Sequence, residues 1–211
     1  MLLDAFQEVG ERTSIHYPES LLQSSPCGLH RVSLDEAKII LPQFQELYDS
    51  VPIPKDDWHN WEIDLKIHML MPNQYPCVPN WHCDNVPRVD GKTRFDLIED
   101  DTPRMYLWLS DNPTTEFLRP DVKVACVNPQ SHKDVAKPCN YVTGYGGSVK
   151  IPAQQWISMS QRTPHRGTKS DKHQWRIFAR LTHKSIMSAR PVISPIRRHA
   201  QVYLDPDTFT W

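Results

Sequence analysis

The segment Pro79-Asn-Trp-His82-Cys-Asp84 carries an imidazole and a carboxylate two residues apart. On extended backbone, residues i and i+2 point to the same face, so both side chains can reach one metal ion. Two histidines and one carboxylate on one face of an octahedron suit Fe(II) and leave the remaining positions open for other molecules. The pair therefore predicts a metal centre that needs a second histidine from elsewhere in the chain.

The His-x-Asp spacing is weak evidence when it stands alone. Ten histidines and 25 acidic residues in 211 positions produce about one such match by chance. A second match, His132-Lys-Asp134, lies in the polar stretch NPQSHKDVAKP, which we interpret as a solvated loop because no apolar residues flank it. For His82 and Asp84 the alternative is an ordinary turn, in which the aspartate caps backbone amides and the histidine is half-exposed.

A candidate third ligand, His165, lies in the later segment Gln161-Arg-Thr-Pro-His165-Arg-Gly, and the segment Trp175-Arg176-Ile-Phe-Ala-Arg180-Leu-Thr182 follows it. This order resembles the Fe(II)/2-oxoglutarate-dependent oxygenase superfamily. In that superfamily a double-stranded β-helix carries His-x-Asp/Glu, then a distal histidine, then an arginine or lysine that pairs with the far carboxylate of 2-oxoglutarate. Here Arg176 falls eleven positions after His165.

The resemblance covers approximately residues 60–184 and implies a specific activity. It implies a dioxygenase in which His82, Asp84 and His165 hold Fe(II) and 2-oxoglutarate is the co-substrate, with no catalytic residue beyond the metal ligands. Hydroxylation of the substrate, with release of succinate and CO2, is the expected outcome. The substrate is expected to be a small molecule or a side chain that the sequence does not identify. Four arginines flank the predicted site and either orient an anionic substrate or form solvated surface: Arg88, Arg104, Arg162 and Arg166.

The choice of the arginine for 2-oxoglutarate stays open between two positions. The superfamily often has a small hydroxyl residue two positions after this arginine, but Phe178 stands two after Arg176, whereas Thr182 stands two after Arg180. All four residues share one face of the predicted strand. Two buried arginines without anionic partners would be costly, which argues for a bound carboxylate. Arg176 is the first choice, and Arg180 with Thr182 is the alternative, unless Arg180 is a structural salt-bridge residue.

Two other functions are compatible with the sequence. One is a cupin-like metalloenzyme that uses the same kind of β core without 2-oxoglutarate. The other is a non-catalytic binding module in which residues 185–211 make the interaction. A zinc site that uses Cys83 is disfavoured, because structural zinc takes four ligands in paired short spacings and the sequence has no partner pair. We therefore expect Cys83 to point away from the metal.

The elements that must position these residues are mainly strands. Residues 61–69 alternate apolar with polar side chains, which predicts a half-buried strand. The 19 prolines favour short strands joined by stiff connections. The fold class we expect is mainly β (α+β), a double-stranded β-helix or jelly-roll core with N-terminal helices packed against it. Further short β-like runs lie at 105–109, 115–118, 123–127, 147–151, 156–159 and 175–182.

The clearest predicted helix begins at Ser33-Leu-Asp-Glu36, which is a capping-box pattern, and Pro42 should kink or split it. One domain is expected overall, with a helical segment over 1–60, the core over 61–184 and an extended arm over 185–211. The arm either wraps the core or reaches a partner, and a homodimer through the arm is one expectation.

Composition excludes several classes of protein. The formal net charge of -1 gives no support to nucleic-acid binding. No apolar run is long enough to cross a bilayer, and the first residues lack the pattern of a signal peptide. Five cysteines without a CxxC pair are typical of free thiols in a reducing compartment, so a cytoplasmic location without membrane partners is expected.

Overall fold

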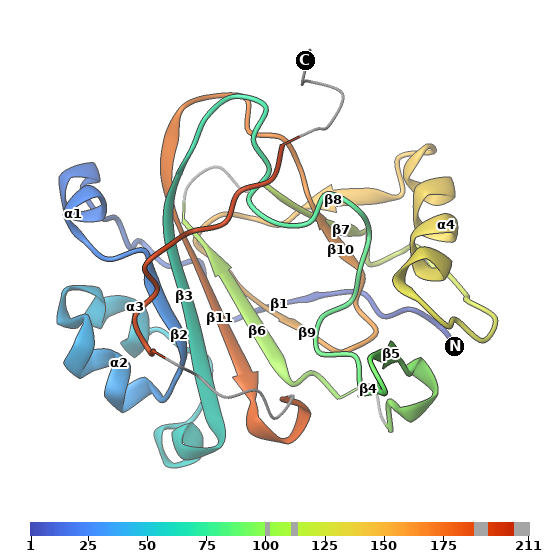
Figure 1. Ribbon diagram of the computed structural model, residues 1–211, viewed down its shortest axis with the longest axis horizontal. Coiled ribbons are helices and arrows are strands. Elements are labelled where there is room, and N and C mark those ends of the chain that lie inside the picture. The colour runs from blue at the N-terminus through green and yellow to red at the C-terminus, as the bar shows by residue number, and fades with distance from the viewer. Residues whose placement is uncertain (100–101, 111–113, 188–193, 205–211) are drawn as a thin grey trace.

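The computed structural model describes residues 1–99, 102–110, 114–187 and 194–204, and it is mainly β, as expected (Figure 1). Its centre is an antiparallel sheet of six strands in the order β1-β9-β6-β11-β3-β2. A second antiparallel sheet has the order β10-β7-β8, and β4 and β5 form a separate hairpin. The six-stranded sheet consists of β1 (Gln7–Val9), β2 (Gly28–Val32), β3 (Trp61–Leu70), β6 (Met105–Leu109), β9 (Trp156–Met159) and β11 (Gln174–His183). The other strands are β4 (Arg88–Val89), β5 (Lys92–Thr93), β7 (Thr115–Leu118), β8 (Ser148–Lys150) and β10 (His165–Gly167).

The long strands β3 and β11 pair along their whole length and give the sheet two different faces. On one face Ile63, Leu65 and Ile67 of β3 pack with Ile177 and the N-terminal helices in a single apolar cluster. These helices are α1 (Glu19–Ser24), α2 (Leu34–Ile40) and α3 (Gln45–Asp49), which lie together at one side of the sheet in Figure 1. The predicted packing of N-terminal helices against a β core is confirmed.

The opposite face of β3 and β11 corrects the prediction of a half-buried strand. Asp64 and His68 on this face are each only 4% exposed, whereas Glu62 and Lys66 are half-buried. Arg180 lies opposite Asp64 and Arg176 lies opposite His68 in the ladder. The alternating pattern located the strand but could not show that its polar face is also covered. The covering segments come from distant parts of the chain.

The predicted N-terminal helix is split at the proline. Ser33 caps α2 by accepting a hydrogen bond from the Glu36 backbone N–H at 3.2 Å, and Pro42 begins a separate 3-10 turn, η1 (Pro42–Phe44). Proline lacks the N–H that an α-helix needs, so the chain restarts as α3. The other 3-10 turns are η2 (Lys55–Asn60), η3 (Phe95–Leu97) and η4 (Lys184–Ile186).

Two local predictions were wrong. The stretch around His132 is not a loop but the helix α4 (His132–Thr143), in which Asp134 and Ser131 form a capping box. The helix contains Pro138, a residue that is disfavoured in the interior of an α-helix. Residues 123–127 form no strand, and only Ala125 makes an isolated bridge, with Leu2.

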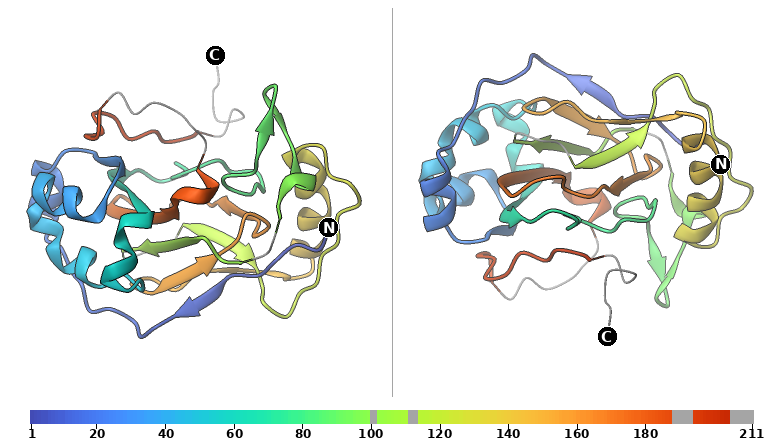
Figure 2. Two further views of the ribbon diagram at one scale, coloured as in Figure 1. Left: turned by 90° about the horizontal axis from the view of Figure 1, so that it is seen from below. Right: turned by 90° about the horizontal axis from the view of Figure 1, so that it is seen from above.

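The described part of the C-terminal arm, residues 194–204, lies along the edge of the chain's own six-stranded sheet (Figure 2). Ile196 forms a bridge with Leu29 of β2, and Tyr203 forms one with Tyr75. The described part of the arm therefore lies against the core, and the homodimer stays a prediction. Across the described ranges, no helix combines the length and apolar character needed to traverse a bilayer.

Candidate metal centre

His82 and His165 are brought together by backbone pairing between distant segments. His82 belongs to the irregular segment between β3 and β4, and His165 begins β10. The His82 N–H donates to the His165 carbonyl at 3.0 Å, and the His165 N–H donates to the His82 carbonyl at 2.9 Å. This reciprocal pair sets the two imidazole rings side by side, with centroids 4.5 Å apart.

Asp84 completes a group of three potential metal ligands. One ligand atom from each of His82, Asp84 and His165 lies within 4.8 Å of the other two. Asp84 Oδ2 is 3.5 Å from His165 Nε2, and Asp84 Oδ1 is 3.9 Å from His82 Nε2. The structure therefore assembles the three predicted ligands into one group that could hold a metal ion.

Hydrogen bonds to the outer ring nitrogens orient both histidines. His82 Nδ1 lies 2.8 Å from the Asn80 carbonyl, and His165 Nδ1 lies 3.3 Å from the Thr163 carbonyl. A carbonyl at Nδ1 fixes the tautomer that carries its proton there, which leaves the Nε2 lone pair for a metal. In both rings Nε2 is the atom that faces Asp84.

The ionisation states suit metal binding. Burial, together with the neighbouring His165, lowers the pKa of His82 to about 4, so this imidazole is neutral at pH 7. Burial alone would raise the pKa of Asp84, but the charge of Arg180 and contacts with the histidines hold it well below its usual range. Metal ligands must be deprotonated, and both groups already are.

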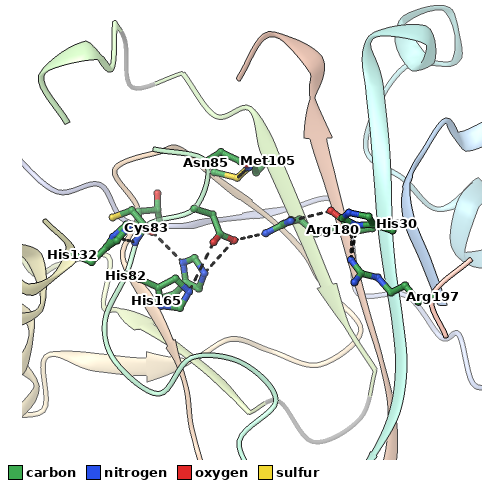
Figure 3. A network of polar contacts seen from close by, with 12 residues as sticks. His30, His82, Cys83, Asn85, Met105, His132, His165, Arg180 and Arg197 are labelled. Atoms are coloured by element: carbon green, nitrogen blue, oxygen red, sulfur yellow. Dashed lines mark hydrogen bonds and ion pairs between the residues drawn. The ribbon is translucent and has the colours of Figure 1, made fainter. Parts of the chain in front are cut away.

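Arg180 links the candidate centre to the six-stranded sheet. Its Nη1 donates to Asp84 Oδ2 at 2.5 Å, and its Nη2 donates to Asp64 Oδ2 at 2.9 Å. Asp64 Oδ1 in turn lies 2.6 Å from Arg197 Nη2 and 2.8 Å from His30 Nδ1. Figure 3 shows Arg180 between the paired histidines on one side and His30 with Arg197 on the other.

Arg176, four residues earlier on β11, has a different environment. It is 1% exposed, and its side chain donates to the Thr114 hydroxyl. Within the described residues it forms no ion pair, and its Nε has no hydrogen-bond partner. Burial lowers its pKa to about 10. The two candidate arginines thus differ among the described residues: Arg180 pairs with the carboxylates of Asp64 and Asp84, whereas Arg176 pairs with no carboxylate there.

Further unpaired polar groups surround Arg176. Its cross-strand neighbour His68 is buried with both ring nitrogens unpaired in the described structure, and so is the hydroxyl of Thr168. Thr168 adjoins Thr114, whose carbonyl accepts its backbone N–H at 2.8 Å. Buried polar groups normally have partners, so this concentration of unpaired groups indicates a place for a polar ligand or ordered water.

Thr182 does not join this group. It lies six residues after Arg176, which corresponds to about 20 Å along an extended strand. Its hydroxyl is buried and has no partner among the residues described. Phe178, the residue two positions after Arg176, packs against the apolar cluster of β6 and β9.

A cavity of about 1280 Å³ opens beside the candidate ligands His82 and Asp84. One wall is α4, whose residues Lys133, Ala136 and Lys137 line it, and His132 at the start of α4 lies 6.4 Å from the His82 ring. The sequence analysis placed His132 in a solvated loop, away from the site, because its helix was not predicted. The helical spacing of Val135 and Cys139, which are buried, is the signal that could have found it.

The four flanking arginines divide into two pairs. Arg88 and Arg104 line the cavity. Arg162 donates to the Ile98 carbonyl, and Arg166 forms an ion pair with Glu116, so those two serve the protein's own packing.

Cys83 packs away from the ligand atoms, in an apolar cluster with Trp81 and Cys139. Burial raises its pKa well above the usual range, so it is a neutral thiol. The group of potential ligands consists of nitrogen and oxygen donors without sulfur. Such a donor set suits iron or manganese better than a structural zinc site.

Comparison with known proteins gives no relative: no family model, curated protein or solved structure matches this chain.

Proposed function

We propose that this chain is an Fe(II)- and 2-oxoglutarate-dependent dioxygenase that hydroxylates its substrate. The proposal includes a double-stranded β-helix core, for which the six-stranded and three-stranded antiparallel sheets give support. Asp84 is hydrogen-bonded to Arg180 on the first sheet and lies close to His165 on the second. The candidate centre therefore sits between the two sheets, which agrees with the sequence resemblance.

The observation that carries the proposal is the buried guanidinium of Arg176, which has no ionic partner among the residues that the structure describes. A fully buried cation without an anionic partner is strongly unfavourable, and proteins keep such groups where a ligand supplies the missing charge. Arg176 lies on the same face of β11 as Arg180, which contacts Asp84. A dicarboxylate could bind the metal with one end and could supply the missing negative charge at Arg176 with the other.

The residues of the chain divide the work as follows. His82, Asp84 and His165 would hold the metal, and Arg176 with Thr114 would hold the far carboxylate of the co-substrate. Burial lowers the pKa of His68 to about 2, so its neutral ring can donate a hydrogen bond to the same carboxylate without competing for charge. When bound, iron and 2-oxoglutarate supply the oxidation of the substrate by dioxygen, with succinate and CO2 as co-products. The burial of Arg176, Thr114 and His68 keeps bulk water away from the place of the far carboxylate.

The test compares two keto acids that differ in the far carboxylate. We expect 2-oxoglutarate to raise the melting temperature of the Mn(II)-loaded protein and 2-oxobutyrate to leave it unchanged. We also expect the iron-loaded protein to form succinate from 2-oxoglutarate. The variant Arg176→Met should bind 2-oxoglutarate about 10- to 100-fold more weakly, which is the range for charged hydrogen bonds.

The same measurements discriminate the alternative functions. Metal binding without any response to 2-oxoglutarate would favour a cupin-like metalloenzyme. Absence of Mn(II) binding, with His82→Ala and Asp84→Ala behaving as the unmodified protein does, would favour a non-catalytic module.

A further inference from the structure

The hydrogen bonds around Asp64 connect the candidate metal ligand Asp84 to the C-terminal arm. We propose that Arg180, Asp64 and Arg197 are positioning residues that hold Asp84 ready for the metal, so that the C-terminal arm contributes one residue, Arg197, to the metal centre. This inference rests on the proposed function, because it requires a metal at Asp84. None of the three is one of the potential metal ligands His82, Asp84 and His165.

Asp84 needs external support because its backbone is irregular. It lies in the segment between β3 and β4, where the bridge between His82 and His165 is the nearest regular pairing. The following residue, Asn85, has a φ of 53°, in the left-handed region. Arg180, by contrast, comes from the middle of β11, which is paired on both sides by β3 and β6. A rigid strand therefore supplies the group that fixes the carboxylate.

The contact of Arg180 with Asp84 leaves one oxygen for a metal. Arg180 donates to Oδ2, which also lies 3.5 Å from His165 Nε2, whereas Oδ1 lies 3.9 Å from His82 Nε2 and accepts no hydrogen bond from the described residues. Hydrogen bonding of one carboxylate oxygen orients the other and favours a single metal–oxygen contact. Such support from residues outside the ligand set commonly controls metal affinity.

Asp64 keeps Arg180 from neutralising Asp84. A guanidinium that paired with Asp84 alone would oppose the binding of a divalent cation. Asp64 accepts a hydrogen bond from the second guanidinium nitrogen, Arg180 Nη2. The side chain of Asp64 is buried, and the residue is 4% exposed. Burial would raise the pKa of Asp64, but His30, Arg180 and Arg197 together lower it, so it remains charged. The positive charge of Arg180 is thus shared between two carboxylates.

Arg197 closes the network from the arm. Its Nη2 lies 2.6 Å from Asp64 Oδ1, its Nε donates to the Leu29 carbonyl at 2.7 Å, and its backbone N–H donates to the Gly28 carbonyl at 2.9 Å. These bonds fix the second oxygen of Asp64, and through it the orientation of Arg180. Loss of the Arg197 side chain should therefore change the orientation of the Asp84 carboxylate, although the two residues are not hydrogen-bonded to each other.

The experiment measures Mn(II) affinity from the electron paramagnetic resonance signal of free Mn(II), with the full chain and no co-substrate. We expect Asp64→Asn to weaken Mn(II) binding about 10- to 100-fold, and Arg197→Met to weaken it in the same direction, following the usual effect of such supporting residues. Arg197→Lys, which keeps the charge near Asp64, should recover part of the affinity.

The matched control is Lys66→Met. Lys66 lies two residues from Asp64 on the same face of β3 and also holds the arm, by donating to the Gln201 carbonyl at 2.5 Å. It makes no hydrogen bond to Asp64, Arg180 or Asp84 in the described structure. The control should therefore keep its Mn(II) affinity within about threefold of the unmodified protein, a factor that corresponds to less than 1 kcal/mol.

The absorption spectrum of bound Co(II) gives a readout that general loss of stability does not change. Asp64→Asn should alter the ligand-field bands, whereas Lys66→Met should not. If His82→Ala and Asp84→Ala abolish Mn(II) binding but Asp64→Asn and Arg197→Met do not weaken it, the positioning network is refuted and the metal centre stands. If His82→Ala and Asp84→Ala also bind Mn(II) normally, the proposed function itself fails.

Discussion

Arg176 and Arg180 lie four residues apart on one face of β11, yet replacing them should change stability in opposite directions. We expect Arg176→Met to stabilise the metal-free, ligand-free protein and Arg180→Met to destabilise it. Methionine keeps an unbranched apolar side chain of similar reach, so both changes chiefly remove the guanidinium. The difference follows from the partners that each arginine has.

The magnitudes follow from the two environments. Burial lowers the pKa of Arg176 from 12.5 to about 10, which at 1.36 kcal/mol per pH unit disfavours the charged form by about 3 kcal/mol. The lost hydrogen bond to Thr114 offsets about 1 kcal/mol of that relief. A net stabilisation of about 2 kcal/mol is therefore expected for Arg176→Met. Arg180→Met leaves Asp64 and Asp84 without their shared cation, and breaking a buried pair costs about 3 to 5 kcal/mol.

Urea unfolding with EDTA at pH 7.5, followed by tryptophan fluorescence, measures both free energies of unfolding. The reasoning is refuted if Arg176→Met destabilises the protein by 1 kcal/mol or more, because Arg176 would then have a partner that neutralises it. A second check uses the ligand. If Arg176→Met were more stable and still bound 2-oxoglutarate as tightly as the unmodified protein, the buried charge of Arg176 would destabilise the fold without contributing to co-substrate binding.

Three further predictions concern stability. His68 keeps a pKa of about 2 when folded and 6.5 when unfolded, so its own contribution to stability is full above pH 6.5 and falls by about 2 kcal/mol between pH 7.5 and pH 5 as the unfolded chain takes up the proton. His68→Gln should flatten this part of the stability profile in urea titrations, and an unchanged slope would contradict the assignment. Gly28 has a φ of +122°, and an added Cβ would lie 2.0 Å from the Leu65 carbonyl oxygen. Gly28→Ala should therefore cost at least about 2 kcal/mol by calorimetry, and a cost under 1 kcal/mol would show that β2 can move. Ser33→Ala should cost about 1 kcal/mol through the lost helix cap, whereas Ser33→Asp should not; equal losses would argue against the cap.

The sequence predicts the ligands better than it predicts their supports. His82 and Asp84 are two residues apart, so local geometry already places them on one face, and the order of motifs selects His165. The bond between Asp64 and Arg180 depends on the register of β3 against β11. The apolar pattern of each strand determines which face is buried, but β3 and β11 are far apart in the sequence and no hairpin turn fixes the offset between them.

The choice between Arg176 and Arg180 shows the same limit. Both occupy one face of one strand, and the spacing rules of the resemblance point to each in turn. Only the distant segments that cover this face distinguish them, because one segment brings Asp84 and another brings Thr114. The alternation over 61–69 predicts a half-buried strand for a related reason: it shows that the two faces of the strand differ, but it does not show which segments cover each face.

The arm that holds Arg197 also closes an open sheet. Strand β2 is the last strand on its side of the six-stranded sheet, and its free edge pairs with residues 195–197 through the His30 and Arg197 backbone N–H groups. An uncovered edge of this kind is a template for the strand of another molecule. By pairing with this edge, the arm therefore protects the sheet against edge-to-edge aggregation. The same bonds made by a neighbour's arm would exchange segments between two chains, so weakening this contact should show itself first as concentration-dependent association.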